Sequence, residues 1–258
     1  MTESSKTAET VRVASDPIDI VLRQLGAMRK VDLAPLLERG IPRIPTHPHL
    51  MIDKAVTHER DGYYCQAIMM GEHTGAHVDA PAHMVPDMMH RTIDTFEADR
   101  LFGAAVLYDF SERALQPGDL ITAADMQAEE ERTGVAAGEG EIALINFGWM
   151  KRYWRTDSQA RWFAMNSPGL SEDVTEMLRD RKIRAVGTDT VAAETAIVDG
   201  RFGPDPGHVK NWLPNDILII EMLRNLEQVT KRSLFLAMPL RIHEGSGSPI
   251  RPIAFCPV

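Results

Sequence analysis

Eleven consecutive residues in the first third of the chain hold an unusual number of side chains that can bind a metal. Residues 73–83 have the sequence HTGAHVDAPAH, which places three imidazoles and one carboxylate within a short stretch. These groups are the ligands that hold Zn²⁺, Mn²⁺ or Fe²⁺ in proteins. An isolated histidine is more often a surface or satisfied core residue, but this density and spacing predict a metal site.

The segment is expected to be extended rather than helical. The first two histidines have the four-residue spacing of one helix face, yet Gly75, Val78 and Pro81 all disfavour a helix. A turn at Gly75 followed by a strand fits better, because His77 and Asp79 would then point to the same side.

The simplest arrangement of these groups is one metal ion with three protein ligands. His73 can reach from the turn to the point that His77 and Asp79 share on the strand. His83, four residues beyond Asp79, would lie on the same side as an unligated acid or base. The residues therefore predict a metal site formed by His73, His77 and Asp79, with His83 beside it.

A second candidate is Glu221, which interrupts the apolar residues of an expected strand at 216–223. A buried carboxylate needs a cation or several hydrogen-bond donors to offset the cost of removing it from water. A structural ion pair with Arg224 or Arg241 would also meet that need, so the residues alone leave both possibilities open. His208, in a Gly/Pro-rich loop, is unremarkable by itself.

The elements that must position these groups alternate between helices and strands. Helices are expected over 18–28, 122–132 and 171–181. The second begins at Thr122 and stops at Gly134, and Ser171 caps the third. A loop is expected over 35–48. Strands are expected over 63–70 (buried, leading into the metal segment), 104–110, 141–147, 183–187, 216–223, 233–242 and 250–256. This pattern predicts an α/β fold with a mixed sheet.

Composition limits the kinds of partner that the chain can have. It has 258 residues, 44% of them apolar, and a net charge of −9 without a basic stripe. The charge argues against nucleic acid and anionic membranes as partners. Residues 1–16 are expected to be a flexible arm without a signal peptide, and residues 17–258 a single domain. Cys65 and Cys256 each lie in an apolar run and are expected to be buried, reduced thiols in the cytoplasm.

The segment 73–83 resembles the His-x-Gly-Thr-His-x-Asp-x-Pro-x-His signature of the cyclase family of metal-dependent hydrolases, which includes bacterial kynurenine formamidase and isatin hydrolase. Residues 166–169, 186–189 and 247–251 are similar to further landmarks of that family. One position departs, because Ala76 stands where the family usually has Thr or Ser. A hydroxyl near the metal would then be missing.

The resemblance implies a swivelling β/β/α fold, in which helices flank a central, barrel-like mixed sheet, and assembly as a homodimer or homotetramer. In formamidase-like members a histidine and a glutamate join the motif aspartate to bind a second zinc, which implies that Asp79, His208 and Glu221 hold that ion here. Isatin hydrolase-like members bind one Mn²⁺ through the residues that match His73, His77 and Asp79. The cofactor is thus expected to be one or two ions of Zn²⁺ or Mn²⁺.

The expected activity is hydrolysis of a C–N or C–O bond in a small cyclic amide, lactone or N-formyl aryl amine by metal-activated water. His83 is the expected catalytic acid/base. Two alternatives stay open: a single-Mn²⁺ lactam hydrolase of the isatin hydrolase kind, and a non-catalytic member that only binds a metal or ligand. No Gly-x-Ser-x-Gly elbow, P-loop, dinucleotide fingerprint or His-Glu-x-x-His motif competes with this reading.

Overall fold

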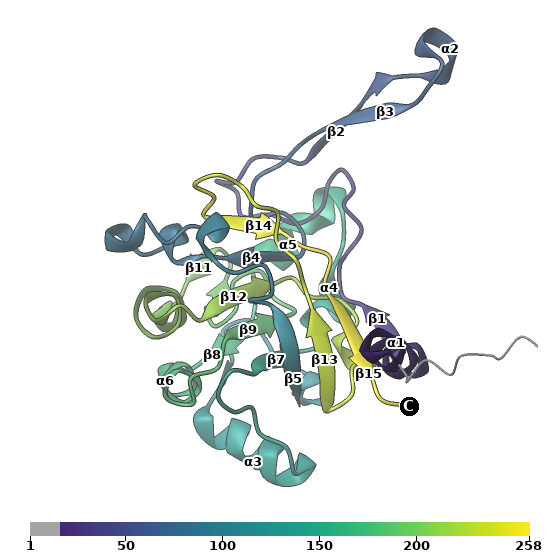
Figure 1. The fold of residues 1–258 in the computed structure, drawn as a ribbon. Coiled ribbons are helices and arrows are strands. Elements are labelled where there is room, and N and C mark those ends of the chain that lie inside the picture. Colours follow the sequence, from purple (N-terminus) through teal and green to yellow (C-terminus); the bar gives the residue numbers. More distant parts are fainter. Residues whose placement is uncertain (1–15) are drawn as a thin grey trace, which may run out of the picture.

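The computed structural model describes residues 16–258, so the expected arm at 1–16 lies almost wholly outside the described residues. One curled, nine-stranded sheet organises the fold (Figure 1). Its strands, in sheet order, are β1 Arg29–Asp32, β15 Ile253–Cys256, β13 Arg232–Leu236, β5 Phe102–Asp109, β7 Ile142–Asn146, β9 Ala185–Thr188, β12 Leu218–Glu221, β4 His77–Asp79 and β14 Gly247–Pro249.

The remaining elements are helices and three small sheets. The helices are α1 Pro17–Ala27, α2 His58–Asp61, α3 Ala123–Thr133, α4 Trp149–Tyr153, α5 Ala160–Ala164 and α6 Glu172–Asp180, with a π-helical turn at Gly207–Asn211. Three small two-stranded sheets pair β2 Met51–Val56 with β3 Cys65–Met69, β6 Leu120–Ile121 with β8 Gly169–Leu170, and β10 Ile197–Val198 with β11 Arg201–Phe202.

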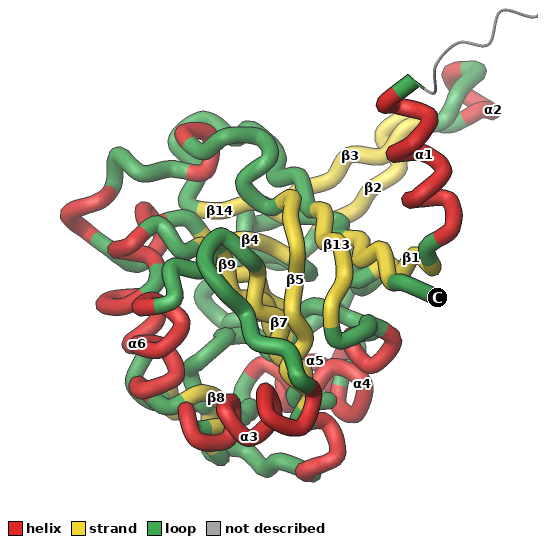
Figure 2. The backbone as a smooth tube through the Cα atoms, turned by 60° about the horizontal axis from the view of Figure 1, so that its bottom comes forward, coloured by secondary structure: helices red, strands yellow, loops and turns green. Residues whose placement is uncertain are grey.

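The large sheet is mixed, as the sequence predicts. Strands β5, β7, β9 and β12 run parallel, whereas β4 is antiparallel to β12 and β14 is antiparallel to β4. Alternate residues face opposite sides of each strand, so Ala143 and Ile145 of β7 pack in the cluster that includes Met126 of α3, while Ile142 and Leu144 pack on the other face. Figure 2 shows α3 and α6 gathered on one side of the strands.

Several expected element boundaries are confirmed. Thr122 caps α3 through a reciprocal capping box with Asp125, and Gly134 ends that helix with a φ of +72°. Ser171 stands at the N-cap of α6, although its side chain makes no capping hydrogen bond there. The stretch 35–48 forms no helix or strand.

The strand expected at 63–70 is wrong in its burial. β3 pairs only with β2, and this hairpin projects away from the large sheet, so every residue of β3 is exposed (Figure 1). The same projection explains why Cys65 is exposed, while Cys256, on β15 between β1 and β13, is buried as predicted. Ile18, Ile20, Val21 and Leu22 of α1 are likewise exposed, and this helix fully buries none of its side chains.

No helix among residues 16–258 combines the length and the apolar character that a membrane crossing needs.

We predict that Gly169→Ala lowers the free energy of unfolding, by about 1–3 kcal/mol for overpacking of this kind. A Cβ at Gly169 would come within 2.2 Å of the Glu194 carbonyl oxygen and 2.6 Å of the Ala196 nitrogen, both of them backbone atoms. Gly26→Ala in α1 is the control, because a Cβ there meets nothing within 4 Å and alanine favours a helix. Denaturant unfolding measures both variants, and equal stability of the two would contradict this packing.

Candidate metal centre

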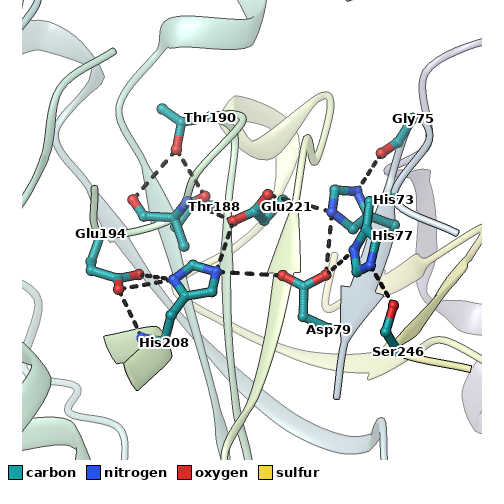
Figure 3. Close-up of polar contacts among 11 residues, drawn as sticks. His73, Gly75, His77, Asp79, Thr188, Thr190, Glu194, His208, Glu221 and Ser246 are labelled. Atoms are coloured by element: carbon teal, nitrogen blue, oxygen red, sulfur yellow. Dashed lines mark hydrogen bonds and ion pairs between the residues drawn. The ribbon is translucent and has the colours of Figure 1, made fainter. Parts of the chain in front are cut away.

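Two neighbouring strands bring the candidate ligands together. In the antiparallel pair β4–β12, Glu221 lies directly opposite His77, and Ile219 lies opposite Asp79. Because side chains alternate along a strand, His77, Asp79 and Glu221 all emerge on the same face of the sheet. Figure 3 shows their polar groups converging on one point.

The turn before β4 fixes the orientation of His77. Gly75 has a φ of +64°, and its carbonyl oxygen accepts a hydrogen bond of 2.8 Å from His77 Nδ1. A carbonyl oxygen can only accept, so Nδ1 carries the proton and a neutral imidazole leaves the Nε2 lone pair free. That Nε2 lies 3.4 Å from Asp79 Oδ1 and 3.4 Å from Glu221 Oε2.

His73 also contacts the central carboxylate. Its Nδ1 lies 2.6 Å from Asp79 Oδ1, and its Nε2 lies 2.9 Å from Ser246 Oγ, which in turn donates to Glu72 Oε2 at 2.5 Å. The structure therefore brings all three residues of the predicted first site together. For His73 to bind an ion, one of its two hydrogen bonds must give way.

His208 approaches the same two carboxylates from the π-helical turn. Its Nε2 lies 3.5 Å from Asp79 Oδ2 and 3.6 Å from Glu221 Oε1. Its Nδ1 lies 2.9 Å from Oε1 of Glu194, a buried carboxylate in the loop after β9. Glu194 could not be recognised from the sequence, because nothing in the local sequence of that loop indicates that it contacts His208.

The separations between these atoms fit a bound cation. Contacts of 3.4–3.6 Å between His77 or His208 Nε2 and the carboxylate oxygens are longer than good hydrogen bonds. Two ligand atoms on one tetrahedral ion, with bonds of about 2.0–2.1 Å, lie about 3.3 Å apart. Moreover, Asp79 Oδ2 is buried without a hydrogen-bond partner in the described part of the chain. The donor set therefore fits a divalent ion.

The charges of the site lead to the same conclusion. Within residues 16–258, Asp79 and Glu221 form ion pairs only with histidines, so the alternative of a pair with Arg224 or Arg241 is wrong. Burial opposes ionisation of Asp79, but the imidazoles of His73 and His77 hold its pKa well below its usual range. A cation supplies positive charge that protonated imidazoles must otherwise provide.

Burial and neighbouring charged groups also shift the pKa values of Glu221, His77 and His83. Burial, together with the Asp79 carboxylate, raises the pKa of Glu221. Burial opposes the charged form of His77, but Asp79 and Glu221 raise its pKa to about 9. Burial and the neighbouring imidazoles of His73 and His208 lower the pKa of His83 to about 4 despite the opposing effect of Asp79.

His83 lies beside the ligands at the edge of the cluster. Its ring centroid is 3.9 Å from that of His73, with the planes tilted by 31°. The donor atoms form two compact groups that share Asp79: one with His77 and Glu221, the other with His73 and His83. The expected unligated histidine is thus close enough either to serve a bound water or to bind an ion itself.

A cavity of about 200 Å³ opens beside the cluster. Its walls combine the histidines with apolar side chains, namely Ile44, Met84, Val191, Phe202 and Met222. Three large aromatic residues do not line this cavity, because Trp149 and Trp212 are buried in the core and Tyr63 is exposed on the hairpin.

The alanine that departs from the family pattern faces away from the ligands. Ala76, Val78 and Ala80 pack in the apolar cluster on the opposite face of the sheet from His77 and Asp79. A hydroxyl at position 76 would lie in that apolar cluster, so its absence leaves the polar contacts of the ligands intact.

The chain is similar in sequence and in structure to known isatin hydrolases. Isatin hydrolase of Roseibium aggregatum is 30% identical over 236 residues, which cover 88% of this chain and 86% of the relative. Isatin hydrolase A from Labrenzia aggregata, bound to benzyl benzoate, has a similar structure, with a TM-score of 0.82 and 25% identity over 94% of this chain and all of that chain.

Another solved structure, of an isatin hydrolase bound to the product analogue thioisatinate, has a TM-score of 0.74 and 25% identity, with coverage of 93% of this chain and 97% of that chain. These structures confirm the predicted fold class. Residues 31–195 match the family model described as "Putative cyclase". The chain therefore belongs to the cyclase family, as its metal-binding segment indicates.

Proposed function

We propose that this protein is a metal-dependent hydrolase that opens a small cyclic amide with water. The observation that carries the proposal is the buried Asp79 carboxylate, which lies between two sets of ligand atoms beside a cavity with apolar walls. An apolar cavity of about 150 Å³ is enough to hold one benzene molecule. The space of about 200 Å³ therefore suits a single planar ring system.

The relatives support a cyclic amide over the other substrates considered. Isatin hydrolases are among the similar proteins, and one of them holds the product analogue thioisatinate. Lactones and N-formyl aryl amines have the same polarised carbonyl and form the second substrate class to test. A purely binding function has less support, because the relatives described are named as hydrolases.

We assign the ligands of two ions, Zn²⁺ or Mn²⁺, that share one carboxylate. The first ion would be held by His73, His77 and Asp79, and the second by Asp79, His208 and Glu221. Asp79 Oδ1 lies beside His73 and His77, and Oδ2 lies beside His208, which supports this division. His77 Nε2 is also 3.4 Å from Glu221 Oε2, so His77 lies between the two sets of ligands. A single ion, as the single-Mn²⁺ alternative requires, would leave Glu221 as a structural acid.

Ions bound in these places would lower the pKa of a water molecule and polarise the substrate carbonyl. The residues of the chain provide the remaining chemistry. Asp79 and Glu221 fix the positions of the ions, and the apolar walls hold the ring of the substrate against them. His83, which lines the cavity, takes the proton of the attacking water and passes it to the leaving nitrogen.

We predict that wild-type apo-protein takes up two equivalents of Zn²⁺ or Mn²⁺, and that the Glu221→Gln variant takes up one. The Asp79→Ala variant should take up none, because both ions share Asp79. Equilibrium dialysis followed by elemental analysis gives these numbers. Asp87→Ala, which removes an exposed carboxylate, is the control and should keep both ions. One equivalent for both the wild type and Glu221→Gln would contradict the pair and favour the single-ion alternative.

The activity itself is tested with purified, metal-loaded protein and a panel of lactams (isatin included), lactones and formanilides. His83→Ala should keep its metal and its fold but lose about 10²–10⁴ in turnover, the usual contribution of a positioned acid/base. His90→Ala, at an exposed position, is the matched control. If the metal-loaded protein hydrolyses none of these compounds, the proposed function is wrong. If the His83→Ala variant instead loses its metal, His83 is a metal ligand and not an unligated acid/base.

We also propose that the chain assembles as a homodimer or homotetramer through the β2–β3 hairpin. A two-stranded hairpin is marginally stable alone in water, and this one exposes Met51, Tyr63, Tyr64, Ile68 and Met69. Light scattering should give a mass that is a multiple of 28.8 kDa for the wild type and a smaller one for Ile68→Lys. A monomeric wild type would rule this assembly out.

A further inference from the structure

Glu194 is a fully buried carboxylate that no step of the proposed reaction uses. Its Oε1 accepts hydrogen bonds from the backbone N–H of His208 at 2.9 Å and lies 2.9 Å from His208 Nδ1, while its Oε2 lies 3.1 Å from the same Nδ1 (Figure 3). Within residues 16–258, its only ion-pair partner is His208. The whole polar environment of this carboxylate is therefore directed at one histidine.

The surrounding backbone is shaped to permit this contact. A Cβ at Gly207 would approach Glu194 Cδ to 2.8 Å and Trp212 to 2.4 Å, so only glycine lets the carboxylate reach the next residue. The backbone of Glu194 is held in turn, because its carbonyl oxygen accepts a 2.8 Å hydrogen bond from Leu170 N. His208 itself stands in a π-helical turn, a rare feature that is frequent at functional sites.

These contacts determine which nitrogen of His208 faces the carboxylates. A neutral imidazole that donates Nδ1–H to Glu194 carries its lone pair on Nε2. That Nε2 is the atom 3.5 Å from Asp79 Oδ2 and 3.6 Å from Glu221 Oε1. Residues that hold the far nitrogen of a ligating histidine in this way typically change metal affinity by about 10–100-fold.

We propose that Glu194 is a positioning residue: it holds His208 with Nε2 directed at Asp79 and Glu221, and thereby sets the affinity for the second ion. This inference rests on the proposed two-ion function. It assigns Glu194 a role without placing it in contact with the ion, the water or the substrate.

The test is calorimetric titration of apo-protein with Zn²⁺, for the wild type and Glu194→Gln. The amide nitrogen of Gln can occupy the place of Oε2 and donate to Nδ1, which favours the tautomer with the proton on Nε2 and blocks ligation. We expect the affinity for the second equivalent to fall by about 10–100-fold, with the first equivalent and the melting temperature nearly unchanged.

A second readout follows the tautomer directly. Two-bond ¹⁵N–¹H spectra of protein with labelled histidine and one equivalent of zinc, which leaves the second site empty, should show the His208 proton on Nδ1 in the wild type and not in Glu194→Gln. Glu129→Gln is the matched control, because Glu129 is also buried and paired, with Arg132 on α3, but lies outside the site. It should affect stability alone.

The outcomes separate this inference from the proposed function. Two equivalents in the wild type with an unchanged second affinity in Glu194→Gln would overturn the positioning role and leave the two-ion function standing. A single equivalent in the wild type would overturn both. Equal weakening of both equivalents together with a lower melting temperature would make Glu194 a structural residue and overturn the positioning role.

Discussion

Two buried carboxylates on the same face of the sheet determine the chemistry of this protein. Asp79 and Glu221 lie among histidines, and no lysine or arginine of the described chain pairs with either. Ionised groups buried in this way are strongly destabilising unless positive charge compensates them. Protonated imidazoles can supply that charge, but a divalent cation does so while the imidazoles act as neutral ligands. The site therefore favours a divalent ion, which supplies the positive charge and leaves the imidazoles neutral.

The sheet supplies the geometry that this arrangement needs. The antiparallel register of β4 and β12 sets Glu221 against His77, and a shift of one residue would turn either side chain to the opposite face. The apolar residues on the other face, such as Val78 and Ile220, hold that register because they pack in the core. Stability of the core and position of the ligands therefore depend on the same alternation, and a slip of the strands would cost both.

Local sequence signals were sufficient for the part of the site that is continuous in the chain. Gly75, the β-branched Val78 and Pro81 predict a turn followed by a strand, and alternation then predicts that His77 and Asp79 share a face. Glu221 could be recognised because it interrupts an apolar strand. Nothing local marks Glu194, whose role depends on a contact with a turn that follows it in the chain. The exposure of β3 could not be predicted either, because an apolar run looks the same whether the chain buries it or projects it into solvent.

The central claim is that Asp79 bridges two ions, and the distance between those ions tests it most directly. X-ray absorption at the zinc edge of the fully loaded protein should contain metal–metal scattering at about 3.5–4 Å, the usual spacing in two-metal sites. The same signal should be absent from Glu221→Gln. A wild-type spectrum that contains only nitrogen and oxygen neighbours at saturating zinc would contradict the account.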